Sequence, residues 1–474
     1  MQKRSWGLVG MGVMGTALSR NFARHGISLS LYNRFLEGQE EQLAKAQIAR
    51  YEELKEALPF EDVSAFVASL ERPRNILMMI SAGPAIDEFI AQVTPHLEVN
   101  DVLIDGGNAH YESSIRRAAL LAKSNIHYLS LGVSGGEEGA LHGPSLMASG
   151  RAVIFDRVKP VLTKIAAQNS KNQACFVFTK GEGSGHFIKM VHNGIEYAEM
   201  QLLAECYDLM KTQWQLSNEA IAAIFEQWQQ TASKSYLLQI TITVLQTKNS
   251  EGAVIDQILD CASNKGTGKW ALIAAANLGV AVPLMGAALQ ARFISSMKEE
   301  RTALSNKYTV EPKVDRSETL GIAALKRVYD FSRILNHHQG FELIQAAVKA
   351  YQWEVDLTNV ARAWTGGCII QSVLMGYLAT GFKKDDQILS MPACSQWLQD
   401  HKSQLALDYK FLLSESVPMP CSTAAWHYFL GITQKDSAAN LIQAQRDYFG
   451  AHGFQWKNDP EAGLSQGDWN INKE

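Results

Sequence analysis

The chain has 474 residues, 46% of them hydrophobic and 19% charged, and a formal net charge of −4 at pH 7. This is ordinary globular usage, enough for about two to four domains, and it excludes disordered and collagen-like chains. A slightly acidic chain has no overall attraction for nucleic acid, so we expect no such partner. Six scattered Cys, without a CxxC pair or zinc-like spacing, indicate a reduced cytoplasmic protein with no metal site.

The first 180 residues alternate short apolar runs with helical stretches such as 16–24 and 111–123, which is typical of βαβ units. The short runs are continuously apolar, so we predict a parallel sheet that is covered on both faces. Its strands are expected at residues 6–9, 27–32, 76–80, 102–104, 126–131, 146–148 and 175–178.

The character of the chain changes after the glycine-rich residues 180–185, because almost every stretch to about residue 428 has helical periodicity. We predict an α/β, Rossmann-like dinucleotide-binding domain (1–180), a large all-α domain (181–430) and a polar C-terminal tail (431–474). Residues 271–289 are almost wholly apolar and come close to membrane-spanning length. Gly279 and Pro283 divide this segment, so we expect two buried helices and no membrane partner.

A GxGxxG turn links the first predicted strand to the first predicted helix. Glycines in such a turn let a pyrophosphate approach the backbone, and the helix N-terminus offers unpaired N–H groups to the phosphates. We therefore predict dinucleotide binding by Gly10, Met11, Gly12, Val13, Met14 and Gly15.

The residues after the second predicted strand indicate which dinucleotide is bound. An acidic residue there would bind the ribose 2′-OH of NAD and repel a 2′-phosphate, but this chain has Asn33 and Arg34. A neutral amide beside a guanidinium suits a 2′-phosphate, which favours NADP. The alternative is that Arg34 is only a solvated surface charge.

Four polar residues recur at helical spacing just after the glycine-rich segment. Their positions, i, i+3, i+4 and i+7, place them on one helix face. An ammonium, an imidazole, an amide and a carboxylate together suit acid–base chemistry on a polyhydroxylated substrate. The four residues are Lys189, His192, Asn193 and Glu196. The alternative is that they form a solvated polar stripe on the surface and pair only with one another.

Three loops add anion-binding capacity. Asp105-Gly-Gly-Asn108 ends a predicted strand at the sheet edge where ligands of open α/β folds bind. Ser134-Gly-Gly136 can offer backbone N–H groups to a carboxylate. Lys265-Gly-Thr-Gly-Lys269 lacks full P-loop spacing and is a basic turn suited to a monophosphate. The first two can equally be structural turns.

These motifs lie in the order seen in the decarboxylating 6-phosphogluconate dehydrogenase family, which the sequence resembles over essentially its whole length. The motifs are GLVGMGVMG, IDGGN, VSGGEEGALHGPSLM, GHFIKMVHNGIEY, KGTGKW, GGCII and IQAQRDYFGAH. The resemblance implies the pentose phosphate pathway reaction, in which NADP oxidises 6-phosphogluconate to ribulose 5-phosphate, CO2 and NADPH. It also implies an obligate homodimer.

The resemblance implies a role for each candidate residue. Lys189 would be the base and Glu196 the acid, and we expect a lowered pKa for Lys189. The sugar hydroxyls and the carboxylate would be held by Asn108, Ser134, Gly135, Gly136, His192 and Asn193. The 6-phosphate would lie among Tyr197, Lys265, Arg292, Arg446 and His452, of which the last two come from the tail of the other subunit.

The chain departs from the family pattern near the cofactor. Phe35 stands where the family has Thr. The resemblance implies that Ile80, Ser81 and Ala82 contact the cofactor, but this loop lacks the Lys that the family usually has there. NAD therefore stays open as a cofactor, Phe35 can stack on adenine, and Asn108 is expected to contact cofactor as well as substrate. Three further departures are Ala109 for Ser, and Thr365 and Gln371 for Arg.

Two other functions stay open. One is a β-hydroxyacid dehydrogenase acting on another phosphorylated hydroxy acid, although a substrate without phosphate would leave Lys265, Arg292 and Arg446 unpaired. The other is a weakly active homologue that binds a nucleotide or a phosphosugar. The presence of both Lys189 and Glu196 argues against this alternative.

Overall fold

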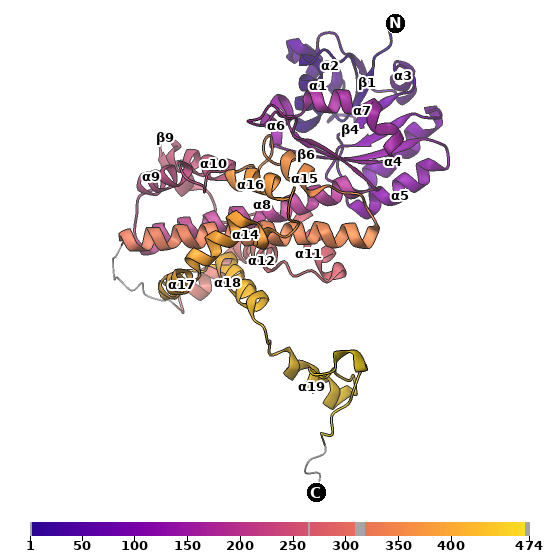
Figure 1. The fold of residues 1–474 in the computed structure, drawn as a ribbon. Helices are drawn as coiled ribbons and strands as arrows, with labels where there is room; N and C mark the ends of the chain where they lie inside the picture. Colours follow the sequence, from indigo (N-terminus) through magenta and orange to yellow (C-terminus); the bar gives the residue numbers. More distant parts are fainter. Residues whose placement is uncertain (1, 264–265, 309–317, 470–474) are drawn as a thin grey trace. The chain divides into compact units, whose positions relative to one another are not determined.

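The computed structural model describes residues 2–263, 266–308 and 318–469. The chain forms two compact units, Met1–Ala425 and Trp426–Glu474. Figure 1 follows the chain through both units. The domain boundaries expected after residues 180 and 430 stay predictions.

A twisted sheet organises the N-terminal part of the first unit. In the described residues it has eight strands in the order β3-β2-β1-β4-β5-β6-β7-β8 (Figure 1). Their residues are almost all buried, as continuous apolar runs predict. The strands are β1 (Trp6–Val9), β2 (Leu29–Tyr32), β3 (Leu58–Phe60), β4 (Asn75–Met78), β5 (Val102–Asp105), β6 (His127–Ser134), β7 (Ser145–Gly150) and β8 (Phe176–Lys180).

Helices cover both faces of this sheet, and each face has its own core. On one face Phe22 of α1 (Val13–Arg24) and Val158 of α7 (Ala152–Ile165) belong to a cluster that includes Leu8 and Leu31. The other face carries α3 (Val63–Ala68), α4 (Pro84–Val93) and α5 (Tyr111–Ala122), whose apolar residues pack with Val9 and Ile76. This arrangement confirms the Rossmann-like architecture.

The sheet differs from the prediction in two places. The β6–β7 pair is antiparallel, whereas every other pair is parallel. A connection containing only α6 (Gly136–His142) is too short for a parallel crossover, so the chain turns straight back. The edge strand β3 was missed because it has three residues and contains Pro59, which only an edge strand tolerates.

A long helix, α8 (Ser184–Asp208), leads from the sheet into the helical part of the unit. Two glycines allow its close approach: a β-carbon on Gly132 would lie 2.5 Å from Lys189 Cβ, and one on Gly185 would lie 2.5 Å from the Met147 carbonyl oxygen. On its other side α8 packs along α14 (Glu318–Tyr351), to which a buried Glu199–Arg333 ion pair of 2.8 Å joins it (Figure 1). The first half of α8 is therefore held between the sheet and a helical bundle.

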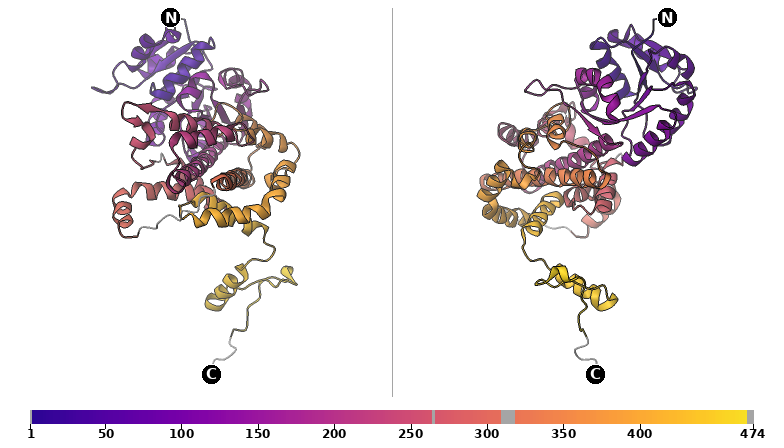
Figure 2. Two further views of the ribbon diagram at one scale, coloured as in Figure 1. Left: turned by 90° about the vertical axis from the view of Figure 1, so that its left-hand side faces the viewer. Right: turned by 45° about the vertical axis from the view of Figure 1, so that its right-hand side comes forward.

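The described remainder of the unit is helical, as predicted, apart from the two-residue strands β9 (Lys248–Asn249) and β10 (Gly252–Ala253). Figure 2 shows the helices of this part from two further sides. Within residues 271–289, α11 ends at Leu278 before Gly279 (φ +66°), and α12 starts at Pro283, which confirms the predicted pair of helices. Among the described residues, no helix combines the length and apolar character needed to cross a membrane. The remaining α-helices of the unit are α2 (Leu43–Arg50), α9 (Asn218–Gln229), α10 (Tyr236–Gln246), α11 (Thr267–Leu278), α12 (Pro283–Ser296), α13 (Lys298–Ser305), α15 (Leu357–Ala363), α16 (Val373–Gly381) and α17 (Pro392–Ser414). The boundary between the two units falls within α18 (Pro420–Thr433).

The second unit is built around α19 (Ala439–Gly450). Asp447 is buried there and accepts hydrogen bonds from the N–H groups of Gly453 and Gly467 and from Trp469 Nε1, at 2.7 to 2.9 Å. These bonds fold the polar segment after the helix back against it. The sequence had indicated only a polar tail in this region.

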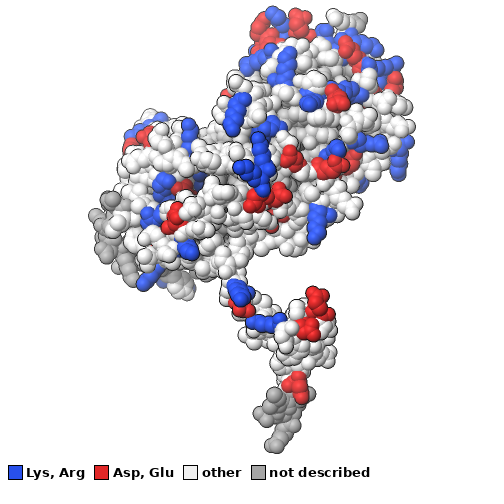
Figure 3. All heavy atoms as spheres, in the orientation of Figure 1, with Lys and Arg blue, Asp and Glu red and all other residues white. Residues whose placement is uncertain are grey.

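Charged side chains of both signs are interspersed over the face shown in Figure 3. Such mixing agrees with the small net charge of −4, and this face carries no one-signed field.

Candidate active site

The four polar residues predicted to share a face lie in the first half of α8. Lys189 and Asn193 are each 7% exposed, His192 is fully buried and Glu196 is half-buried. Buried side chains of this kind do not form a solvated surface stripe. The helix starts after Gly183, whose φ of +82° suits glycine and turns the chain from the sheet into α8.

These side chains contact one another directly. Lys189 Nζ donates to Asn193 Oδ1 and lies 3.4 Å from His192 Nδ1. The same imidazole nitrogen is 3.6 Å from Glu196 Oε2. On its far side, His192 Nε2 bonds to Ser134 Oγ at 3.0 Å, so the loop of Ser134 to Gly136 is joined to the helix.

The environment shifts all three titratable groups toward their neutral forms. Burial lowers the pKa of Lys189, although the nearby Glu196 carboxylate opposes this. Burial and the neighbouring ammonium hold the pKa of His192 well below its ordinary value. Burial raises the pKa of Glu196, against the attraction of Lys189 and Arg292. The site therefore contains a weakened base and a weakened acid close to each other.

A cationic end of the site lies one turn further along α8. The guanidinium of Arg292 stacks over the ring of Tyr197 at 3.6 Å and donates to the carbonyl of Ser263 at 3.0 Å. Gly268, in the basic turn, also lies against this ring, because a β-carbon there would be 2.9 Å from it. Lys265 lies outside the described residues.

The two predicted tail residues belong to the second unit. Arg446 and His452 are exposed there, and Arg446 Nη1 donates to Gln443 Oε1 at 3.2 Å.

The loop after β5 contributes structure as well as a candidate ligand. Asp105 is fully buried, accepts from Tyr128 Oη at 2.5 Å and lies 3.4 Å from Arg117. Its carbonyl contacts His186 Nε2 at 3.0 Å, which ties the loop to α8. Asn108, by contrast, is exposed at the carboxyl edge of the sheet. Sequence reasoning missed His186, although it precedes Lys189 by one helical turn.

The predicted dinucleotide turn has the shape that such a cofactor needs. A β-carbon on Gly10 (φ +91°) would lie 2.5 Å from the Met79 carbonyl oxygen, and one on Gly15 would lie 1.8 Å from that of Gly10. Both glycines are therefore required by packing. Gly12, in contrast, has nothing within 4 Å, which leaves the N-terminus of α1 open to a pyrophosphate.

A groove of about 390 Å³ extends from this turn along the ends of β2 and β4. Seven predicted residues lie outside its lining: buried Met11, whose N–H donates to Asn33 Oδ1 at 2.9 Å, together with Val13, Met14, Gly15, Ala82, Asn108 and exposed Phe35. The predicted residues in the lining are Gly10, Gly12, Asn33, Arg34, Ile80 and Ser81.

The groove also contains a carboxylate that sequence reasoning missed. Glu40 pairs with Arg34 through two contacts, 3.1 Å to Nη2 and 3.2 Å to Nε, and accepts from Asn33 Nδ2 at 3.0 Å. The guanidinium and the amide hold the pKa of Glu40 below its ordinary value. A 2′-phosphate that binds Arg34 must therefore compete with this internal partner.

Comparison with protein-family models matches residues 5–179 to the NAD binding domain of 6-phosphogluconate dehydrogenase. Residues 185–469 match the C-terminal domain of the same enzyme. The Lactococcus lactis subsp. cremoris protein named "6-phosphogluconate dehydrogenase, decarboxylating" is 38% identical over 482 residues, covering 99% of both chains. The Escherichia coli protein of that name is 37% identical over 476 residues, covering 99% of this chain and 100% of the relative.

A solved structure extends the similarity to three dimensions. Plasmodium falciparum 6-phosphogluconate dehydrogenase, described in its apo form and in complexes with NADP+ and with 6-phosphogluconate, superposes with a TM-score of 0.92. It is 34% identical, and the match covers 98% of this chain and 100% of that one. Because the family models, the relatives and this structure all span nearly the whole sequence, the chain belongs to the 6-phosphogluconate dehydrogenase family.

Proposed function

We propose that the protein oxidises and decarboxylates 6-phosphogluconate to ribulose 5-phosphate and CO2 with reduction of NADP to NADPH. The observation that carries this function is the array of buried Lys189, His192 and Asn193 with half-buried Glu196 in a chain of this family. The array places a base and an acid beside a cationic end that suits a phosphate.

The groove along the first strands fits the cofactor. The open N-terminus of α1 at Gly12 would hold the pyrophosphate, and Arg34 would pair with the 2′-phosphate. Bound NADP supplies the acceptor for the hydride that leaves C3 of the substrate. Asn33 keeps the turn in place by accepting the Met11 N–H.

Lys189 serves the first half of the reaction. Its pKa is lowered, so a neutral amine is available to accept the proton of the 3-hydroxyl group. The resulting ammonium lies beside the 3-keto oxygen, polarises the carbonyl and so favours loss of the carboxylate as CO2. Asn193, which accepts from Nζ, holds the amine in position.

Glu196 serves the second half. Burial raises its pKa, which favours the protonated carboxyl group that would donate a proton to C1 of the enediol left by decarboxylation. The donated proton converts the enediol to ribulose 5-phosphate. His192 and Ser134, joined at 3.0 Å, would hold substrate oxygens between the base and the acid.

We further propose a homodimer, in the reducing cytoplasm, whose tails complete the phosphate site of the other subunit with Arg446 and His452. The second unit supports this, because it exposes large apolar side chains that a partner would cover, among them Leu441 (61%) and Phe449 (72%). The six free cysteines suit a reducing compartment. Asn108, Gly135, Gly136, Tyr197, Lys265 and Arg292 would complete the substrate contacts.

An absorbance assay at the reduced-nicotinamide band tests the function. With 6-phosphogluconate and NADP we expect NADPH and CO2 in equal amounts, and slower reduction of NAD. Failure to reduce either dinucleotide would falsify the proposed function. Reduction with another phosphorylated hydroxy acid alone would instead support a different substrate.

The Arg34–Glu40 pair predicts opposite effects of two substitutions on cofactor choice. Arg34→Gln removes the 2′-phosphate partner, so the preference for NADP over NAD, as a ratio of kcat/KM values, should fall about tenfold or more. Glu40→Gln removes the competing carboxylate, so the KM for NADP should fall about two- to fivefold. Equal changes with NADP and NAD would contradict a 2′-phosphate role for Arg34.

A shared active site predicts complementation between two defective chains. Lys189→Met and Arg446→Ala each spoil every site of their own dimer. In mixed dimers, one site combines an intact Lys189 with an intact Arg446 from the other chain. Refolding an equal mixture should therefore restore about a quarter of parent activity. If Arg446 acted within its own chain, the mixture would stay no more active than its two components.

A further inference from the structure

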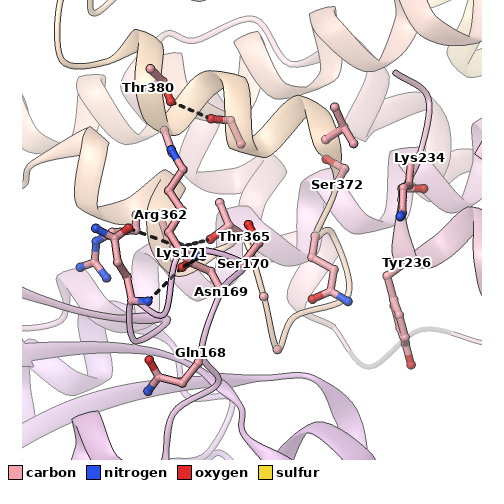
Figure 4. A pocket seen from close by; sticks show the side chains of 18 of the residues that line it. Gln168, Asn169, Ser170, Lys171, Lys234, Tyr236, Arg362, Thr365, Ser372 and Thr380 are labelled. Carbon is pink, nitrogen blue, oxygen red and sulfur yellow. Dashed lines mark hydrogen bonds between the residues drawn. The ribbon is translucent and has the colours of Figure 1, made fainter. Parts of the chain in front are cut away.

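A second cavity, of about 930 Å³, lies in the first unit beside the connection between α15 and α16. Figure 4 shows its walls, which come from three segments. These are the turn of residues 168–173 before β8, residues 229–239 from the end of α9 into α10, and residues 358–383. No residue of α8 lines it, so it is separate from the site described above.

The charged side chains that line this cavity are all positive. Four cations line it, Lys171, Lys234, Arg362 and Lys383, and its lining in the described part of the chain includes no Asp or Glu. Arg362 binds only neutral oxygens, including the Phe176 carbonyl at 2.9 Å. The three lysines form none of the ion pairs found among the described residues. Cations gathered without counter-charges favour an anionic ligand.

Two helix N-termini strengthen the positive field. α10 follows Ser235 and α16 follows Ser372, and the two starts are bonded to each other. Tyr236 N–H donates to the Gln371 carbonyl and Val373 N–H to the Lys234 carbonyl, each at 3.0 Å. Both positive helix ends therefore meet at the cavity, beside the lysine and arginine side chains.

The neutral part of the lining offers many hydrogen-bonding groups beside apolar surface. Its amide and hydroxyl side chains include Gln168, Asn169, Gln239 and Thr380, while Tyr236, Val373, Ala379 and three glycines contribute apolar surface. Thr365 and Gln371, which replace arginines of the family pattern, also line the cavity and are shorter than arginine. Such a lining suits a ligand with both phosphate and hydroxyl groups.

The connection that forms one wall also contacts the active site. Trp364 packs edge-on against the imidazole of His192 at 5.6 Å between ring centroids. The Gly367 carbonyl accepts from Ser145 N–H at 2.8 Å and lies so close to Gly135 that a β-carbon there would be 2.5 Å away. A shift of this wall is therefore transmitted to the loop and the imidazole expected to bind substrate.

We propose that the cavity binds a small phosphorylated polyhydroxy compound, and that its occupancy changes the affinity of the active site for 6-phosphogluconate. The first part concerns binding alone and does not require the enzyme to turn over. The second part rests on the proposed function. The two parts are coupled by linkage, so substrate must change the affinity for the effector by the same factor.

Fructose 1,6-bisphosphate is the probe, titrated calorimetrically at constant ionic strength into the full-length protein. The protein is saturated with NADPH and 6-phosphogluconate, which cannot react together and which occupy the dinucleotide and substrate sites. We expect one site per chain with Kd of about 1 mM or tighter. In Lys171→Gln/Lys234→Gln the affinity should fall about tenfold or more, because both charges are lost.

Lys402→Gln/Lys410→Gln on α17 is the matched control, since both lysines are exposed and lie outside the cavity lining. It should bind the probe as the parent does. The probe should also shift the KM for 6-phosphogluconate at least about twofold in the parent and in the control pair, but not in the cavity pair. Absence of binding at about 10 mM, or equal weakening in both pairs, would overturn the site, whereas binding with an unchanged KM would overturn the coupling.

Discussion

Lys189→Met should reduce turnover of 6-phosphogluconate by about 10⁴-fold or more, because one side chain provides both the base and the later polarisation of the keto group. Methionine has a similar length, and Lys189 is buried, so the fold should persist without a desolvated ammonium. NADP affinity, measured by fluorescence titration, should stay within about twofold of the parent value, since the dinucleotide groove lacks this residue.

The matched control is Lys123→Met, because Lys123 is an exposed lysine at the end of α5. It should retain parent kcat and KM. Residual turnover of a tenth of the parent rate in Lys189→Met would show that another group is the base. Loss of NADP binding as well would point to a folding defect.

Glu196→Gln should lower kcat by about 10²- to 10⁴-fold while leaving the earlier oxidation step able to proceed. NADPH should then form in a rapid burst of about one equivalent per site, followed by slow turnover, as measured by stopped-flow absorbance. Lys189→Met should show no burst, because it blocks the chemistry before hydride leaves. The two variants thus separate the roles of base and acid.

The pH profile provides a second readout for Glu196. The parent should lose activity at high pH, because the carboxyl group, despite its raised pKa, gives up its proton there. In Glu196→Gln this alkaline decline should disappear, whereas the acidic decline caused by protonation of Lys189 should remain. Glu342→Gln is the control, since burial also raises the pKa of Glu342 on α14. An unchanged alkaline decline in Glu196→Gln would rule out its role as the acid.

Much of the fold could be predicted because its elements have strong local patterns. The strand of Trp6 to Val9 was located to the residue, since an apolar run meets a glycine turn there. The direction of β7 could not be predicted, because the apolar residues of a buried strand are the same in parallel and antiparallel pairs. The short edge strand β3, with Pro59, has too weak a pattern to be recognised.

The candidate site was likewise predictable from the sequence only in part. Helical spacing predicted that Lys189 and Glu196 share a face, and the structure adds that this face is buried. Spacing could not reveal Glu40, because it reaches Arg34 through an irregular segment whose path depends on tertiary packing. The cationic cavity was equally hidden, since its lysines are far apart in sequence and meet only in three dimensions.

The bare backbone at Gly132 has a consequence for engineering. A side chain there would meet the β-carbon of Lys189, so the close approach of β6 to α8 requires glycine at this position. Chimeras that join the nucleotide-binding half of one homologue to the helical half of another should therefore keep a glycine here, facing the lysine of the helix. Directed evolution of new hydroxy-acid specificities is better confined to the loops, so that the contact between Gly132 and Lys189 stays unchanged.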